Sequence, residues 1–133
     1  MGRRELREQI FKLLFRIEFN KAEEMPEQIK LFFEDNEKTV LEPDEAYISQ
    51  KYKNIVDKKT DIDLALNEVA EGWKTERMGK VDLTILRLAV YEIKYDEDVP
   101  ASVAINEAVE LAKKFGQDGS PAFVNGILAK FAK

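Results

Sequence analysis

The chain has 133 residues, of which 44% are hydrophobic and 35% charged, with a net charge of −5, no cysteine and no histidine. This length fits one folded domain, and the missing side chains exclude catalytic triads, thiolate zinc sites and disulfides, so we expect neither an enzyme nor a cofactor nor a metal site. No stretch approaches the roughly 18 apolar residues of a membrane span or a secretory leader, so we expect a cytoplasmic protein with no membrane partner.

The amino-terminal part predicts three helices. Apolar residues recur at helical spacing from Leu6 to Ile17, which predicts a helix over residues 4 to 20. Pro26 suits the first turn of a short second helix, because proline lacks the N–H group that is unpaired there. A third helix is predicted over residues 45 to 58, after a polar loop.

The middle of the chain predicts two more helices. Thr60 or Asp61 would cap a fourth helix, whose apolar stripe runs to Trp73. Asp82 is the expected N-cap of a fifth helix over residues 83 to 95, where apolar residues lie on nearly every side. A helix of that kind is normally central and buried.

The last part of the chain predicts a sixth helix that ends at Gly116 and a seventh that Ser120 caps, with Pro121 at its first position. Gly126 lies inside the seventh helix, where glycine costs about 1 kcal/mol against alanine, so we expect close packing or a contact there. Seven helices without a strand predict an all-α domain over residues 1 to 133, built as two small bundles that share a core.

Charge is unevenly distributed along the chain. Residues 1 to 21 hold six basic and three acidic side chains, residues 22 to 110 hold eleven and twenty-two, and residues 111 to 133 hold four and one. If the two basic ends meet, they form one basic patch on an acidic body, which suits a specific RNA. The alternative is two solvated helix faces.

The second half of the chain contains three motifs, WKTERMGKVDLTILRLAVYE over residues 73 to 92, VPASVAINEAVELAKKFG over 99 to 116 and FVNGIL over 123 to 128. With these motifs it resembles the NusB family of bacterial transcription antitermination factors. The first half matches more loosely, through its arginine-bearing start and Leu14-Phe15. The resemblance implies an all-helical, non-catalytic fold that binds boxA RNA of ribosomal RNA leaders together with the ribosomal protein NusE. Through this pair it would act on the RNA polymerase antitermination complex.

The resemblance also suggests residues that hold RNA phosphates. Arg3, Arg4 and Arg7 would pair with them, because guanidinium groups bind phosphate in a bidentate manner and a helix N-terminus favours negative charge. A solvated first turn is the alternative. Lys113 and Lys114 would extend the patch, or would only complement the dipole at the end of their helix.

Bases would be contacted at the start of the last helix. Phe123 would stack on an unpaired base, and ordinary core packing is its alternative. Asn125 would donate to RNA or to a neighbouring loop. Gly119 belongs to the same expected surface, and it stands where family members often have an acidic or polar residue.

Three residues resemble the positions through which the family engages NusE: Phe15, Glu18 and Asp82. Acidic groups suit a basic ribosomal protein, and Asp82 could also cap its helix. Arg87 and Glu92 lie in the predicted central helix, so we expect them to pair inside the protein.

The main alternative is a NusB-like interaction module with little RNA binding of its own, which would hide its RNA face in a weak homodimer. The RNA-targeting helical domain of certain ribosomal RNA methyltransferases is a second alternative, which the length disfavours because no cofactor loop follows. A carboxylate-based hydrolase is a third, and it would need a cleft with an acidic group of raised pKa.

Overall fold

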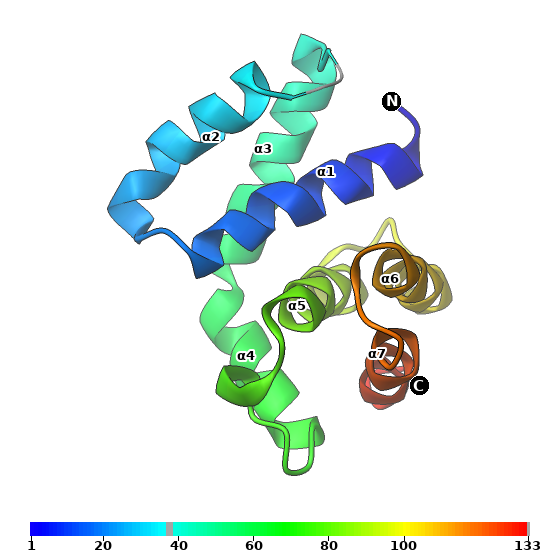
Figure 1. The fold of residues 1–133 in the computed structure, drawn as a ribbon. Helices are drawn as coiled ribbons and strands as arrows, with labels where there is room; N and C mark the ends of the chain where they lie inside the picture. The colour runs from blue at the N-terminus through cyan, green and yellow to red at the C-terminus, as the bar shows by residue number, and fades with distance from the viewer. Residues whose placement is uncertain (37–38, 133) are drawn as a thin grey trace. The chain divides into compact units, whose positions relative to one another are not determined.

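A computed structural model describes residues 1–36 and 39–132. These residues form seven α-helices, three short 3₁₀-helices and no strand, which confirms the all-α prediction (Figure 1). The chain divides into two compact units, Met1–Val56 and the residues from Asp57 onward. The single domain with a shared core stays a prediction. None of the helices in the described part is long and apolar enough to span a membrane.

The first unit holds the helices drawn from blue to cyan-green in Figure 1. Its α1 is shorter than the predicted helix, because the chain tightens into a 3₁₀-turn and the Asn20 side chain donates to the carbonyl of Arg16 (2.9 Å). The second helix begins near Pro26, as predicted. Residues 37 and 38 of the predicted loop lie outside the described part. The elements are α1 (Arg3–Phe15), η1 (Arg16–Glu18), η2 (Ala22–Glu24), α2 (Met25–Glu34) and α3 (Glu42–Asp57).

The core of the first unit comes from one face of each helix. Ile10, Leu13 and Leu14 of α1 are fully buried. The Arg16 guanidinium lies 5.2 Å from the ring centroid of Phe32 and donates to the carbonyl oxygen of Gln28 (3.1 Å). These contacts join the end of α1 to α2.

The second unit is built around α5, which is buried on nearly every side from Leu83 to Glu92 and therefore confirms the predicted central helix. Helices α6 and α7 pack against it and against each other, and α4 contacts it as well (Figure 1). The elements are α4 (Lys59–Val69), η3 (Thr75–Arg77), α5 (Lys80–Tyr95), α6 (Ala101–Phe115) and α7 (Ser120–Ala129).

A part-buried ion pair joins α4 to α5. The Nε and Nη2 atoms of Arg87, which is 4% exposed, donate to the two carboxylate oxygens of Asp63, both at 2.9 Å. The predicted internal pairing of Arg87 is therefore confirmed. Glu92 is buried in the same helix.

The three predicted side-chain caps are wrong. Helix α5 begins earlier than expected because Gly79, in extended conformation, accepts from the N–H of Leu83 (2.9 Å). This leaves Asp82 inside the first turn. The residues at the N-cap positions of α4, α5 and α7 are Lys58, Gly79 and Gly119, and none makes a side-chain capping bond.

Two predictions about glycines have different outcomes. Gly116 ends α6 as predicted, and a Cβ there would lie 2.5 Å from the Cβ of Ser120. Only glycine allows this approach of the two segments. Gly126 is exposed on α7, and a Cβ there would meet no described atom within 4 Å beyond the helix's own neighbouring backbone. Close packing within the described chain therefore does not explain this glycine.

Candidate nucleic-acid interface

The expected phosphate-binding arginines share the first turns of α1. Arg3 and Arg4 are exposed and Arg7 is half-buried. The helix begins after Gly2, which is extended and, as a glycine, provides no side-chain cap for the first turn. A turn of this kind attracts anions, although Glu5 reduces its net charge.

The two lysines at the end of α6 are exposed and have local contacts. The Nζ of Lys113 lies 3.5 Å from Glu110 Oε1, and the Nζ of Lys114 lies 5.5 Å from the centroid of the Phe115 ring. Both readings of these lysines, as RNA ligands or as charges that complement the helix dipole, are compatible with this geometry. They belong to a different unit from α1, so one joint basic patch stays a prediction.

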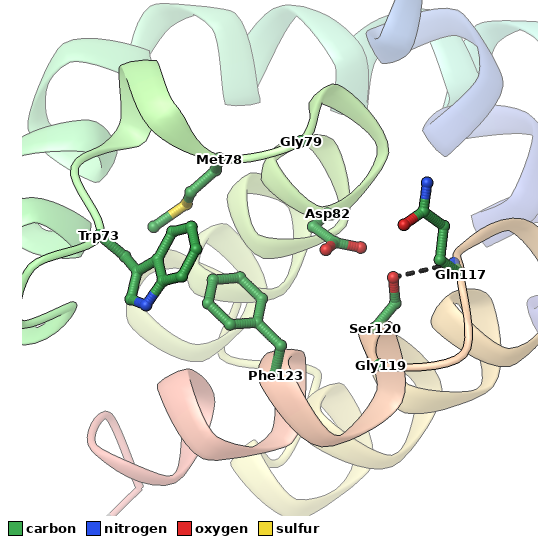
Figure 2. Close-up of a pocket in the computed structure, with 8 residues that line it drawn as sticks. All are labelled: Trp73, Met78, Gly79, Asp82, Gln117, Gly119, Ser120 and Phe123. Atoms are coloured by element: carbon green, nitrogen blue, oxygen red, sulfur yellow. Dashed lines mark hydrogen bonds between the residues drawn. The ribbon is translucent and has the colours of Figure 1, made fainter.

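A pocket of about 180 Å³ lies in the second unit, where three separate segments meet (Figure 2). The turn after α4, the start of α5 and the loop into α7 each contribute to it. It brings together Phe123 and Gly119 of the expected RNA set and Asp82 of the expected partner set. Its lining residues are Trp73, Met78, Gly79, Asp82, Gln117, Gly119, Ser120 and Phe123.

Two aromatic rings form one wall of the pocket. Trp73 and Phe123 meet edge to face, with ring centroids 5.8 Å apart and an interplanar angle of 72°. Trp73 is 54% exposed and Phe123 is half-buried, so Phe123 packs partly against a neighbour while its ring still borders the pocket. An exposed indole beside a second ring offers a surface on which an unpaired base can stack.

Trp73 was not among the expected site residues, because the apolar stripe assigned it to the fourth helix. That helix ends at Val69, and Gly72 turns the chain with a φ of +75°. Since this backbone region strongly favours glycine, a glycine directly before the only tryptophan was the signal of an exposed turn.

Asp82 lies in the first turn of α5 and faces the loop of Gln117 and Ser120. Its Oδ1 is buried and has no hydrogen-bond partner among the described residues, while the residue as a whole is partly exposed. Figure 2 shows its carboxylate turned toward the loop, where Ser120 Oγ accepts from the N–H of Gln117 (3.0 Å). The pocket therefore contains an acceptor that the described part of the protein leaves unpaired.

Exposed cations occupy the segment that leads from the aromatic wall to Asp82. Lys74, Arg77 and Lys80 are all exposed, and Glu76 is the other acidic residue between positions 73 and 82. Sequence reasoning missed these residues as a group, because they lie in a 3₁₀-turn and a helix start rather than on one regular face. Their charge suits an anionic ligand at the pocket.

The other expected contacts lie elsewhere. Asn125 is exposed on α7 and is not part of the pocket lining. Phe15 is half-buried and meets the ring of Phe19 edge to face at 5.1 Å, next to the half-buried Glu18. Phe19, which is 62% exposed, was also missed by sequence reasoning.

A pKa shift is present outside these surfaces. Burial raises the pKa of Tyr52 on α3 above its ordinary value of 10, because the charged phenolate is poorly solvated there. The phenol therefore stays neutral at physiological pH, and Tyr52 supplies no charge for binding.

Comparisons with known proteins agree over almost the whole chain. The model of the NusB family matches residues 4–133. A transcription antitermination protein NusB from Agathobacter rectalis is 51% identical over 132 residues, which cover 99% of this chain and 100% of the relative. The structure of T. maritima NusB is 33% identical, with a TM-score of 0.86 over 99% of this chain and 91% of that one. A crystal structure of the antitermination factors NusB and NusE in complex with double-stranded RNA shares the fold, at 23% identity and a TM-score of 0.83, over 97% of this chain and 94% of that one.

Proposed function

The chain belongs to the NusB family of non-enzymatic transcription antitermination proteins, and we propose that it binds boxA-type single-stranded RNA of ribosomal RNA leaders together with the ribosomal protein NusE. The observation that carries this proposal is the likeness over the full length of both this chain and its relative. An antitermination factor acts on nascent transcripts, so its place is the bacterial cytoplasm, beside RNA polymerase.

We assign the phosphate contacts to the start of α1 and to the exposed cations of the second unit. Arg3 and Arg4 present guanidinium groups at an uncapped helix start, with Arg7 one turn further on. Lys113 and Lys114 add positive charge at the end of α6. Contacts of this kind position RNA without reading its sequence.

We assign the contact with bases to the pocket and its surroundings. Single-stranded RNA is usually recognised by splaying out unpaired bases and stacking them on aromatic side chains. Trp73 and Phe123 provide such a surface beside Gly119. Asn125 lies on the exposed side of the same helix and would donate to the backbone of the RNA.

The partner surface is the end of α1 and the turn after it. Phe15 and the exposed Phe19 provide an aromatic pair, and Glu18 between them provides negative charge for a basic ribosomal protein. Asp82, which the resemblance also assigns to this partner, lines the pocket of the second unit, and its unpaired carboxylate oxygen would accept from a basic group of NusE.

The test is binding of a labelled boxA-type RNA and a scrambled control at several salt concentrations, with and without NusE. Arg4→Ala combined with Arg7→Ala should weaken binding of both RNAs. It should flatten the dependence of log K on log salt by about 1.4, since each lost phosphate contact on single-stranded RNA contributes about 0.7. Preference for boxA over the scrambled RNA should survive, because phosphate contacts carry no sequence information.

The matched control is Lys30→Ala combined with Lys53→Ala, which removes the same charge from exposed positions of α2 and α3. Its salt dependence should stay close to that of the unmodified protein. If the unmodified protein binds neither RNA even with NusE, the RNA role fails. Sedimentation would then test the alternative of a dimeric interaction module.

A further inference from the structure

The turn that carries Trp73 to the pocket is held by contacts on both of its sides. Helix α4 ends at Val69, and the chain then passes through four exposed residues, 71 to 74, before η3 begins at Thr75. Gly72 in this turn has a φ of +75°. An exposed turn with a glycine can adopt many conformations, so the orientation of the indole needs a separate cause.

Asn67 holds the chain after Trp73. It lies in the last turn of α4, and its Oδ1 accepts from the main-chain N–H of Thr75 at 2.8 Å, in a partly buried position. This hydrogen bond ties the chain two residues after the tryptophan back to the helix before it. Between these points the N–H of Trp73 donates to the carbonyl of Ala70 (2.7 Å), which makes the turn tight.

Lys130 holds the chain before Trp73. It directly follows α7, and its Nζ donates to the carbonyl oxygen of Val69 at 2.7 Å. A lysine at a helix C-terminus satisfies a carbonyl that has no partner inside the helix, and it also complements the helix dipole. Helix α7 therefore contacts this region twice, because Phe123 near its start meets the indole edge to face (Figure 2).

A fixed orientation of the indole should strengthen the stacking of a base. A side chain that is mobile in the free protein loses conformational freedom when a ligand orders it, and this loss weakens binding by about two- to tenfold. A ring that already has the bound orientation avoids the loss. The hydrogen bonds of the turn would therefore contribute to RNA affinity through Trp73.

We propose that Asn67 and Lys130 are positioning residues for the RNA contact at Trp73. They hold the indole beside Phe123 in the orientation that stacks on an unpaired base, and they act on RNA only through this ring. The inference rests on the proposed function, because it needs RNA at the aromatic wall of the pocket.

The first experiment uses the only tryptophan of the chain as its probe, with excitation that selects indole over tyrosine. Asn67→Leu removes the acceptor of the Thr75 N–H without a change in charge. The anisotropy of Trp73 fluorescence should fall and its quenching by acrylamide should rise. The matched control is Asn54→Leu on α3, which removes an asparagine that accepts from Gln50 (2.9 Å) and should leave both readings unchanged.

The second experiment is a double-mutant cycle on affinity for the boxA-type RNA, with NusE present. Asn67→Leu should weaken binding about fivefold when Trp73 is present and less than about 1.5-fold in Trp73→Ala, because a positioning residue has no effect without its ring. Lys130→Met should show the same pattern with a smaller loss. Lys130→Arg keeps a cationic donor, so it should bind RNA like the unmodified protein.

Thermal unfolding of each variant checks that the fold is intact. Lys130→Met changes an exposed side chain, so it tests the inference independently if Asn67→Leu does not fold.

Two results would overturn the inference while leaving the proposed function in place. One is unchanged Trp73 fluorescence, or unchanged RNA affinity, in both Asn67→Leu and Lys130→Met. The other is an equal loss of RNA affinity with and without Trp73, which would mean that these residues do not act through the ring. Failure of the unmodified protein to bind the RNA would instead contradict the proposed function, and the fluorescence of the variants would still show whether the turn is held.

Discussion

The arginine-bearing turn of α1 and the aromatic pocket of the second unit are built in opposite ways. The turn needs one helix and three side chains close together in sequence. The pocket needs three segments that are up to 50 positions apart, from Trp73 to Phe123. The positive charge at the start of α1 should therefore persist when neighbouring residues are substituted. The shape of the pocket, in contrast, depends on the packing of the helices that carry its lining residues.

The support of the pocket comes from residues that do not line it. Asp63 and Arg87 join α4 to α5, which carry the segments on either side of the turn with Trp73. Gly116 allows the chain to pass close to Ser120 before α7 begins. The difference between the two regions predicts that substitutions at these supports act on stability, and that substitutions at the lining act on binding.

The largest expected effect is that of Asp63→Ala. It leaves the buried guanidinium of Arg87 without its bidentate partner. Breaking a fully buried pair in this way costs about 3–5 kcal/mol, which is the upper bound here because Asp63 is 19% exposed. Urea unfolding followed by circular dichroism measures this decrease in the free energy of unfolding. Asp61→Ala, at an exposed position of the same helix, should change the free energy of unfolding by less than about 0.5 kcal/mol. Equal effects of the two substitutions would contradict a supporting role for the pair.

A smaller loss of stability is expected for Gly116→Ala. The new Cβ would collide with the Cβ and Oγ of Ser120, and overpacking of this kind costs about 1–3 kcal/mol. The melting temperature measures it. Because the collision also displaces the loop of Gln117, RNA affinity should fall as well, whereas an unchanged melting temperature would show that the loop adapts without cost.

Trp73→Ala should act on binding rather than on the fold. The indole is 54% exposed, and loss of a stacking aromatic weakens single-stranded RNA binding by about 1–3 kcal/mol. The salt dependence should stay unchanged, in contrast to the arginine variants, because no phosphate contact is lost. A changed salt slope with little loss of affinity would remove the distinction between the two regions.

The sequence was sufficient to predict the regular parts of this fold. Continuous apolarity identified α5 as the buried central helix, and the helical spacing of apolar residues gave the number of helices. It also predicted that Arg87 pairs internally. It did not identify Asp63 as the partner, because the two residues are 24 positions apart and many other acidic residues were available.

The candidate site was predicted only in part, for physical reasons. Phe123, Gly119 and Asp82 were singled out one by one, yet their meeting in one pocket depends on tertiary packing. Asp82 was misread as a cap because Gly79 begins the helix with its backbone alone. Trp73 was predicted to belong to the apolar stripe of the fourth helix, because the helical spacing of apolar residues was extended past Gly72, where the chain turns.

The smallest expected effect is a gain in stability from Gly126→Ala. Glycine inside a helix costs about 0.5–1 kcal/mol relative to alanine, and a Cβ at this exposed position meets no described atom within 4 Å beyond its own helix. The same substitution therefore has opposite signs at Gly116 and Gly126, which urea unfolding of the two variants can establish. If Gly126→Ala raises stability and leaves RNA and NusE binding unchanged, the glycine serves no contact in the complex. If it raises stability but weakens binding of either one, the missing Cβ marks a place where that ligand approaches the backbone of α7.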